Sequence, residues 1–361
     1  MEIILVPSTF YTDPTYYRVL SSLRREFTAR RHSSVILSGR TAANPELQIK
    51  PEPGAVCACG GRRPRSFNKF FLSYLCDLPP GAVVNFHFSG WLRSWHAPAL
   101  LADELAKARL VVTFQDYRHP DLPPLTSAAL VSMRKILLRA HAVTAVSGFL
   151  ARMIRKDFPL VADKLFVIPN GTDVPAKANS AGRPVGRRYI FTVGRAAPYK
   201  GLDLLLFAFA KAVGKRCDAD LVICGTDGRG ALSNLAQKLG IADHVIFKGL
   251  LPPGKIPALM RGCLFYATAP RWESFGMAAL EAMAAGKTVL ASKTGGLSEF
   301  ARNGRNAVLV VPADIENISS AMARLCADNE LREALGRNAA ATALKYSWSK
   351  IADKYIRFAY R

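Results

Sequence analysis

The feature that most restricts the fold is a regular alternation of short apolar runs with segments of helical periodicity. Between the runs, apolar residues recur at helical spacing in Tyr16–Phe27, Pro98–Lys107 and Ala128–Arg139. Strands that alternate with helices are typical of a parallel, doubly wound sheet, in which ligands collect at the carboxyl ends of the strands. In the first half of the chain the predicted strands are Ile3–Val6, Val35–Ser38, Val83–Phe88, Leu110–Phe114, Ala142–Val146 and Leu165–Ile168.

The alternation stops and then starts again, which divides the chain into two domains. Residues 176–188 are rich in small residues, Gly, Pro and Arg, a composition typical of a linker. We therefore expect one Rossmann-like domain in residues 1–175, a second in 189–346, and an amphipathic terminal helix in 347–361. The strands predicted for the second domain are Tyr189–Val193, Asp220–Cys224, Val245–Lys248, Cys263–Ala267, Thr288–Ala291 and Ala307–Val311.

The size and composition of the chain agree with two domains that each bury a core, since it has 361 residues. Half of the residues are hydrophobic, yet no run approaches the roughly 18 apolar residues that a membrane-spanning helix needs. The first residues match a strand and lack the length and the basic residues of a signal peptide. Seven cysteines without a Cys-x-x-Cys pair favour free thiols in a reducing cytoplasm.

The formal net charge of +22 indicates an anionic partner. Nucleic acid, phosphorylated substrates and an anionic membrane surface all suit basic clusters, but no nucleic-acid-binding motif accompanies them. We therefore expect no nucleic acid and favour the membrane surface, with an ordinary solvated surface as the alternative. The two basic clusters are Arg24, Arg25, Arg30 and Arg31, and then Arg62, Arg63, Arg65 and Lys69.

Candidate site residues are concentrated in Glu273–Gly286, where a turn leads into a run of small residues. We expect Glu273 or Ser274 near the N-cap of a helix. Glu281, further along, is suited to accept hydrogen bonds from ribose hydroxyls. The alternative is an ordinary capped amphipathic helix with a solvated glutamate at each end. The N–H groups expected to form an anion site for a diphosphate belong to Phe275, Gly276 and Met277.

A second set of charged residues follows the first strand of the second domain. Arg195 and Lys200 lie five positions apart in a loop bounded by Gly194 and Gly201, which permit tight turns. An arginine fork and a lysine ammonium both suit phosphate oxygens. The alternative is a pair of solvated loop cations.

Together the two stretches resemble the retaining glycosyltransferases of family 4. The pattern Pro-x-x-Glu-x-Phe-Gly-x-x-x-x-Glu-Ala-Met-Ala-x-Gly, with a Gly-Gly pair after it, and Gly-Arg-x-x-x-x-Lys-Gly both match that family. The resemblance implies the GT-B architecture, an α/β fold of two Rossmann-like doubly wound domains facing a central cleft, with the terminal helix crossing back to the N-terminal domain. It further implies an acceptor domain in residues 1–175 and a nucleotide-sugar donor domain in 189–346.

The resemblance also implies roles for single residues. Arg195, Lys200 and Glu273 take catalytic positions, the two cations on the leaving diphosphate and Glu273 on the sugar hydroxyls, while Glu281 holds the ribose. Leu250 belongs to a segment whose backbone meets the nucleotide base in the family. The other implied donor-binding positions are Gly194, Gly201, Ser274, Phe275, Gly276 and Met277.

The N-terminal half departs from the family pattern. The loop Pro7–Pro14 has no glycine where many relatives carry a Gly-Gly pair. Gln115 stands where many relatives carry a histidine next to the transferred sugar. Gln115, His87 and His119 are therefore candidate acceptor-side residues, and ordinary buried or surface histidines are the alternative.

The expected chemistry follows from the motifs that are present and absent. No His-Glu-x-x-His or Gly-x-Ser-x-Gly motif occurs, and no Asp-x-Asp follows a predicted strand, so we expect a metal-independent reaction in which cations and a helix N-terminus stabilise the leaving diphosphate. The resemblance implies a retaining hexosyltransferase with a nucleotide-diphosphate sugar as co-substrate and no cofactor. The charge favours a cytoplasmic enzyme, peripheral on the inner face of the plasma membrane, with a lipid-linked acceptor or a polysaccharide or lipopolysaccharide precursor. The alternatives are a nucleotide-binding scaffold of the same fold without transfer activity, and a sugar-nucleotide epimerase.

Overall fold

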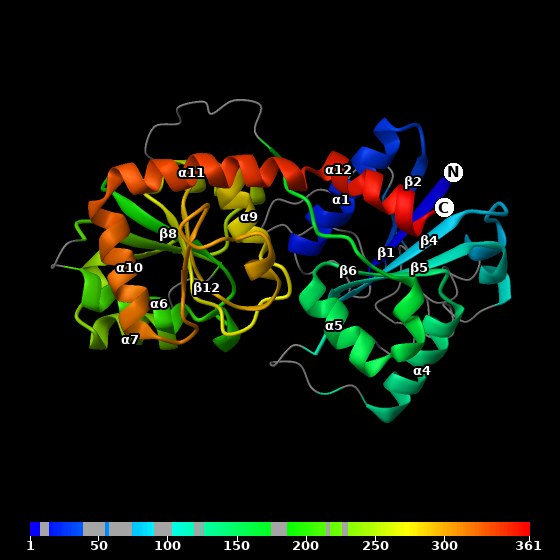
Figure 1. Ribbon diagram of the computed structural model, residues 1–361, viewed down its shortest axis with the longest axis horizontal. Coiled ribbons are helices and arrows are strands. Elements are labelled where there is room, and N and C mark those ends of the chain that lie inside the picture. The colour runs from blue at the N-terminus through cyan, green and yellow to red at the C-terminus, as the bar shows by residue number, and fades with distance from the viewer. Residues whose placement is uncertain are drawn as a thin grey trace. The chain divides into compact units, whose positions relative to one another are not determined.

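The computed structural model describes residues 1–7, 14–38, 55–57, 74–89, 103–118, 124, 126–174, 186–213, 217–225 and 230–361. The chain forms two compact units, Met1–Gly171 with Trp348–Arg361, and Thr172–Ser347. Each unit is a parallel sheet flanked by helices, so the predicted α/β fold class is confirmed (Figure 1). The basic cluster at residues 62–69, most of the loop after the first strand and most of the predicted linker lie outside the described residues.

The first unit contains, in its described part, a seven-stranded parallel sheet in the order β3-β2-β1-β4-β5-β6-β7. Six of these strands coincide with the predicted apolar runs, because strands covered on both faces carry uninterrupted apolar sequence. The seventh, β3, was not predicted because three residues at the sheet edge show no usable pattern. The strands are β1 (Glu2–Pro7), β2 (Ser33–Ser38), β3 (Ala55–Cys57), β4 (Val83–Ser89), β5 (Arg109–Asp116), β6 (Ala142–Ala145) and β7 (Leu165–Val167).

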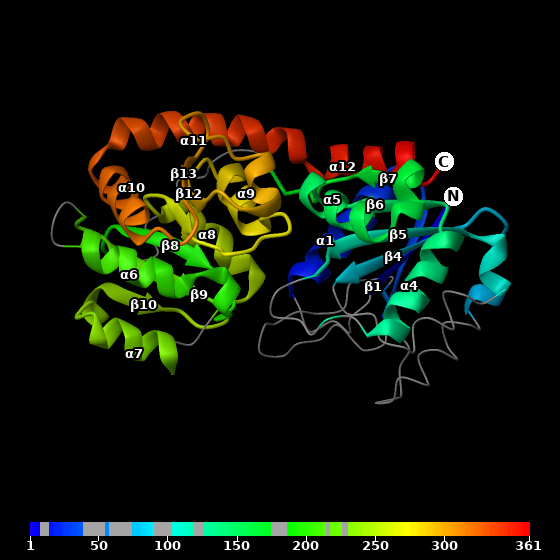
Figure 2. The same cartoon turned by 60° about the horizontal axis from the view of Figure 1, so that its bottom comes forward.

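The helices of the first unit cover both faces of its sheet. They are α1 (Pro14–Ala29), α4 (Ser127–Arg139), α5 (Gly148–Asp157) and the 3-10 helices η2 (Asp103–Lys107) and η3 (Pro159–Lys164). Right-handed crossovers through the neighbouring strands β5, β6 and β7 place α4 and α5 on the same face (Figure 2). The crossover from β1 to β2 runs the other way along the sheet, which places α1 on the opposite face.

The C-terminal segment completes the first unit. Helix α12 (Trp348–Lys354) packs on α1 and continues as a π-helical turn, η9 (Tyr355–Ala359), so that the red and blue ends of the chain lie side by side (Figure 1). Arg30 fastens it, because its Nε donates to Asp353 Oδ1 at 2.8 Å and its Nη2 to Ser349 Oγ at 2.8 Å. The terminal helix therefore belongs to the N-terminal unit, as the GT-B architecture implies.

The second unit contains, in its described residues, a six-stranded parallel sheet in the order β10-β9-β8-β11-β12-β13. The bounds of β8 and β9 are those predicted. Strand β11 begins three residues later than expected, because Cys263 is the C-cap of the preceding helix. The strands are β8 (Tyr189–Val193), β9 (Asp220–Cys224), β10 (Val245–Phe247), β11 (Tyr266–Thr268), β12 (Val289–Ser292) and β13 (Val308–Val310).

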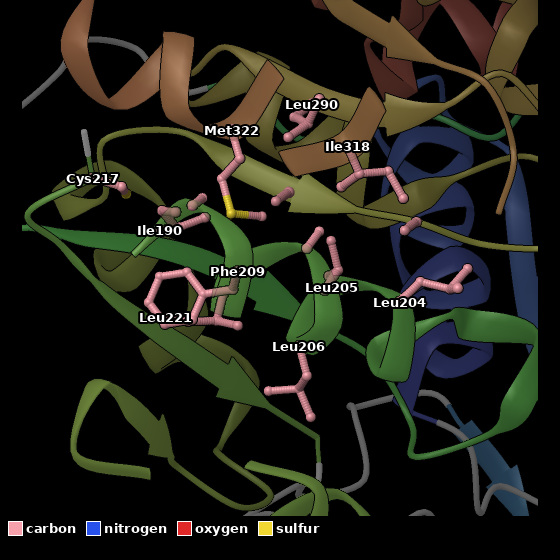
Figure 3. Packing of buried hydrophobic residues seen from close by; sticks show 14 of the residues in the cluster. Ile190, Leu204, Leu205, Leu206, Phe209, Cys217, Leu221, Leu290, Ile318 and Met322 are labelled. Atoms are coloured by element: carbon pink, nitrogen blue, oxygen red, sulfur yellow. The ribbon is translucent and has the colours of Figure 1, made fainter. Parts of the chain in front are cut away.

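The helices of this unit pack a continuous apolar core against the sheet. They are α6 (Leu202–Ala212), α7 (Ala231–Lys238), α8 (Ile256–Gly262), α9 (Met277–Ala284), α10 (Ile315–Ala327) and α11 (Asn329–Ala343), with 3-10 turns at η4 (Pro198–Lys200), η5 (Ala242–His244), η6 (Pro253–Lys255), η7 (Gly295–Glu299) and η8 (Leu344–Tyr346). Leu205 and Phe209 of α6 meet Met322 of α10 in the interior, all without solvent exposure (Figure 3). This core fixes the strand ends from which the site loops emerge.

Two cysteines correct the expectation of free thiols. Cys217 and Cys326 form a disulfide with their Cα atoms 5.1 Å apart, joining the segment before β9 to the end of α10. Their 109-residue separation carried no sequence signal, because the packing of α10 brings them together. Cys224 and Cys263 keep buried free thiols, and burial raises the pKa of each to about 12.

In the ranges that the structure describes, no helix has the length and apolar character to cross a membrane.

Candidate functional site

Glycines shape the loops at the carboxyl edge of the second sheet. Gly201 precedes α6 with a left-handed backbone (φ 64°), and a Cβ there would lie 1.9 Å from the Ala269 carbonyl oxygen. A Cβ on Gly225, after β9, would lie 2.4 Å from the Gly194 carbonyl oxygen. The loops that follow β8, β9 and β11 therefore meet closely at the edge where parallel sheets bind ligands.

The residues Lys200 and Glu273, predicted from separate motifs, form an ion pair. Lys200 Nζ donates to Glu273 Oε2 at 2.9 Å, and the two side chains are 26% and 13% exposed. Burial lowers the pKa of the Lys200 ammonium, but Glu273, with Tyr199 and Tyr266, outweighs burial, so the pKa lies above its ordinary value. Lys200 is therefore charged at neutral pH, and a carboxylate already balances that charge.

Arg195 is the more exposed cation of the same loop. Its Nη2 donates to Tyr199 Oη at 2.9 Å, and the ring of Tyr199 lies under Lys200, with 5.0 Å between Nζ and the ring centroid. Tyr199 thus contacts both cations and keeps them together. Because Arg195 is the more exposed of the two cations, it is the more accessible to an incoming anion.

A bidentate ion pair joins this loop to the loop after β11. Arg271 Nη1 and Nη2 donate to Asp203 Oδ1 and Oδ2 at 2.8 and 2.6 Å, and Nη1 also donates to the Pro198 carbonyl at 2.7 Å. Burial raises the pKa of Asp203, but Arg271 outweighs burial and the pKa is lowered. Sequence analysis missed this pair, because its partners lie 68 positions apart and belong to no motif. The pair holds the backbone two residues before Glu273.

Helix α9 begins later than predicted, which corrects the position of its free N–H groups. Gly276 is the N-cap, with φ 102°, so that Glu273 and Ser274 both precede the cap position. The four N–H groups without helical partners belong to residues 276–279. Of the three N–H groups predicted at the helix N-terminus, those of Gly276 and Met277 lie there, and that of Phe275 precedes it. The cause is the positive φ, which glycine tolerates and which turns the chain one residue before the helix.

The Phe275 side chain points into the unit. It is 3% exposed, and its ring centroid lies 5.3 Å from that of Phe300 and 6.3 Å from that of Tyr346. Phe275 therefore supports the turn from the core, and any contact with a ligand would come from its backbone.

The backbone of Glu273 is held by the turn after β12. A Cβ on Gly295 would lie 1.8 Å from the Glu273 carbonyl oxygen, and the Gly296 N–H donates to that oxygen at 3.0 Å. Glu281 lies half-buried in the second turn of α9. Burial raises the pKa of the Tyr266 phenol, Lys200 opposes this, and Glu273 and Glu281 add to it, so Tyr266 lies within the electrostatic reach of all three charges.

Leu250, predicted to lie in the base-binding segment, is 56% exposed. It follows β10, and the residue before it, Gly249, accepts a hydrogen bond at 2.8 Å from the Gly225 N–H after β9. The segment therefore lies at the same sheet edge as the charged residues, with an apolar side chain open to solvent.

In the first unit, two of the predicted acceptor-side residues form a buried chain of neutral hydrogen bonds. Asn170 Nδ2 donates to Gln115 Oε1 at 2.8 Å, and Gln115 Nε2 lies 3.2 Å from His87 Nδ1. Because that amide nitrogen donates, Nδ1 accepts and the ring proton sits on Nε2, which has no hydrogen-bond partner among the described residues.

The burial of this chain sets its chemistry. His87 and Gln115 are 2% and 4% exposed, and burial lowers the pKa of His87 to about 3. The imidazole is therefore neutral at pH 7. Asn170, interpreted from the sequence as part of a turn, is also a hydrogen-bond donor to Gln115. His119, the third predicted residue, lies outside the described residues.

Comparison with known proteins agrees with this geometry. The family "Glycosyl transferases group 1" matches residues 173–342, and "Glycosyltransferase Family 4" matches residues 18–175. A D-inositol 3-phosphate glycosyltransferase from Actinosynnema mirum is 30% identical over 342 residues, which cover 86% of this chain and 78% of that protein. The chain therefore belongs to the group 1, family 4 glycosyltransferases.

Other relatives match over less of their length. A D-inositol 3-phosphate glycosyltransferase from Nocardia farcinica is 29% identical over 239 residues, covering 62% of this chain and 53% of that protein. The chain thus spans about half the length of this and several other curated relatives. The solved structure of Anabaena Alr3699/HepE in complex with UDP and glucose has a TM-score of 0.78 at 20% identity, covering 99% of this chain and 98% of that one, which shows the shared GT-B fold.

Proposed function

We propose that this chain is a retaining glycosyltransferase that moves a sugar from a nucleotide-diphosphate sugar to an acceptor hydroxyl. The observation that carries the proposal is the convergence, at one sheet edge, of Arg195, the Lys200–Glu273 pair and the N-terminus of α9. Cations and backbone N–H groups suit a diphosphate, and an adjacent carboxylate suits sugar hydroxyls. Membership of the family supports the same activity.

The leaving diphosphate defines the roles of the cations. Arg195, Lys200 and the first-turn N–H groups of α9 would stabilise the charge that develops as the diphosphate departs, so the reaction needs no metal ion. Glu273, oriented by Lys200, would accept hydrogen bonds from the sugar, and Glu281 from the ribose. Retention at the anomeric carbon is what the family resemblance implies.

The solved neighbours suggest which donor to test first. Alr3699/HepE was solved with UDP, with UDP and glucose, and with UDP-glucose. A uridine-diphosphate sugar is therefore the first candidate donor for this chain. The base would meet the segment around Leu250, which lies at the same sheet edge.

The charge of the chain supports an anionic acceptor. The relatives are named for D-inositol 3-phosphate, a phosphorylated acceptor, and the net charge of +22 suits such a group. We favour a lipid-linked acceptor or a polysaccharide or lipopolysaccharide precursor, reached by an enzyme that binds the membrane surface peripherally.

A product assay tests this function. The protein is incubated with UDP-, GDP- and ADP-sugars and with inositol phosphate or a lipid-linked phosphate acceptor, with and without a chelator, and NMR assigns the anomeric configuration. We expect an α-linked product from an α-configured donor, formed equally in the chelator. An inverted product would contradict retention, and loss of activity in the chelator would contradict metal independence.

Matched variants localise the activity. Arg195→Ala and Glu281→Ala should abolish most of the turnover, whereas Arg337→Ala and Glu330→Ala, on exposed positions of α11, should leave it unchanged. Donor binding without transfer to any acceptor or to water would instead favour the nucleotide-binding scaffold, in which the neutral, buried Gln115 replaces a reactive side chain.

A further inference from the structure

Helix α4 presents a mixed apolar and basic stripe to solvent. Val131 and Leu138 are 55% and 59% exposed, and Arg134 and Lys135 between them are exposed as well. Spacings of three, four and seven positions place these four side chains on one side of the helix. The helix is anchored to the sheet by its opposite side, through Met133, Ile136 and Leu137.

The surroundings of this stripe are mostly basic, although α5 ends in Asp157, which pairs with Arg118, and η3 contains Asp163. Residues 127–156 contain six Lys or Arg and no Asp or Glu. Helix α5 lies on the same face of the sheet (Figure 2). It carries three further cations that are exposed. Lys164 donates to the backbone carbonyl of Leu138 at 3.1 Å, which adds a positive charge at the end of the stripe. The cations of α5 are Arg152, Arg155 and Lys156.

These cations differ from those of the opposite face of the unit. Within the described residues, no ion pair involves Arg134, Lys135 or the three cations of α5. On the α1 face, by contrast, Arg30 is bound to Glu26 and Asp353, and α12 covers the helix. The α4 and α5 side therefore keeps its charge available to a partner.

We propose that this side docks on an anionic lipid bilayer. We define the α4–α5 face as Val131, Arg134, Lys135, Leu138, Arg152, Arg155 and Lys156. The cations match the negative lipid headgroups, and the two aliphatic side chains enter the boundary between headgroups and acyl chains. A nucleic acid would match the cations alone, since its backbone offers phosphates but no apolar layer. Membrane binding by this face does not depend on the proposed function. Its role does, because the docking would bring the enzyme to a membrane-borne acceptor.

Vesicle sedimentation tests the docking. The full chain is centrifuged with vesicles of phosphatidylcholine alone or mixed with phosphatidylglycerol. We expect binding to the anionic vesicles only. The double variant Arg134→Glu/Lys135→Glu should lower the partition coefficient by more than about 30-fold, because each cation near such a surface contributes roughly fivefold. Val131→Ser/Leu138→Ser should lower it by about tenfold, also at high salt, where charge attraction is screened.

A matched control separates this face from net charge. Lys238→Glu/Arg337→Glu makes the same charge change on exposed positions of α7 and α11 and should bind within about threefold of wild type. Thermal melts establish that each variant is folded. Three results would overturn the proposal: wild type that does not bind anionic vesicles, equal loss in both charge-reversed variants, or tighter binding of random duplex DNA than of vesicles.

The same samples separate the docking from the enzymatic activity. Transfer to a water-soluble acceptor is measured without vesicles. Lost sedimentation with unchanged transfer in Arg134→Glu/Lys135→Glu supports the docking face. Absent transfer in wild type that still sediments rejects the proposed function and leaves the docking intact.

Discussion

The two units share one architecture but differ in the polar groups that they place at the carboxyl ends of their strands. The second unit places charges there, with Arg195 exposed beside the Lys200–Glu273 pair. The first unit places a neutral imidazole and two amides there, in the chain from Asn170 through Gln115 to His87. In both units the parallel sheet places the ligand site at the carboxyl ends of its strands, and the residues at those ends determine which ligand can bind. The charged groups of the second unit suit an anion, and the neutral amides and imidazole of the first unit suit uncharged hydroxyls.

The units also differ in how they are held together. The second unit is closed by the Cys217–Cys326 disulfide and by the Arg271–Asp203 pair. The first unit is completed by a segment from the far end of the chain, fastened through Arg30. The ties of the second unit join residues of one continuous segment, whereas the tie of the first unit joins the two ends of the chain.

The largest expected effect comes from breaking the charged edge. Glu273→Gln should lower kcat/KM by about 100-fold or more, because it removes the carboxylate that we propose binds the sugar and leaves Lys200 unmatched. The free energy of unfolding should fall by about 2 kcal/mol, below the usual range for buried pairs because Lys200 is partly exposed. Glu316→Gln breaks the exposed Lys211–Glu316 pair and should cost about 0.5 kcal/mol or less. If denaturant titrations showed the same loss of unfolding free energy for Glu273→Gln and Glu316→Gln, the Lys200–Glu273 pair would be no stronger than an exposed pair.

The glycine that shapes the charged edge provides the next test. Gly201→Ala should lower the free energy of unfolding by about 3 kcal/mol, since its Cβ would meet the Ala269 carbonyl and its φ is left-handed. Gly240→Ala is the matched control, because its φ of 67° is similar but no atom lies within 4 Å of the added Cβ. It should cost only about 1 kcal/mol. If Gly201→Ala and Gly240→Ala lowered the free energy of unfolding equally, that result would argue against the close approach of Gly201 to Ala269.

The buried, neutral His87 should make the free energy of unfolding depend on pH. The pKa of His87 is about 3 in the folded chain and about 6.5 when unfolded. Between these values the unfolded state binds more protons, so stability is present above pH 6.5 and is lost as the pH falls toward 3. At pH 5 the loss attributable to His87 is about 2 kcal/mol. His87→Gln should remove this part of the pH dependence in chemical denaturation at pH 7 and pH 5. An unchanged slope would mean that His87 is accessible to protons.

The smallest expected effect concerns the contacts of Arg30 with the C-terminal segment. Arg30→Ala should lower the free energy of unfolding by about 1 kcal/mol, because its contacts are partly exposed. Hydrogen exchange should rise in α12 and η9 and stay unchanged in the second unit. Faster exchange in both units would contradict the assignment of the terminal segment to the first unit.

Strand positions were predictable because buried parallel strands leave uninterrupted apolar runs, as for β8 and β9. The start of α9 was not predictable in this way. Serine is a preferred N-cap residue, but the positive φ at Gly276 places the N-cap two residues after Ser274. The motifs named Lys200 and Glu273 separately, but the sequence contains no sign that they pair with each other. The Arg271–Asp203 clamp and the disulfide were missed for the same reason, because long-range partners are set by packing and not by spacing.

The central claim is that the charged edge of the second unit binds the diphosphate of the donor. Thermal unfolding with UDP-, GDP- and ADP-sugars, UDP and uridine tests it most directly in wild type, Arg195→Ala, Glu281→Ala and the control Arg337→Ala. A ligand that binds only the folded state raises the melting temperature. We expect a shift with one nucleotide diphosphate and little with uridine, lost in Arg195→Ala and Glu281→Ala and kept in Arg337→Ala. No shift with any nucleotide, or an equal shift in Arg195→Ala and wild type, would contradict the claim.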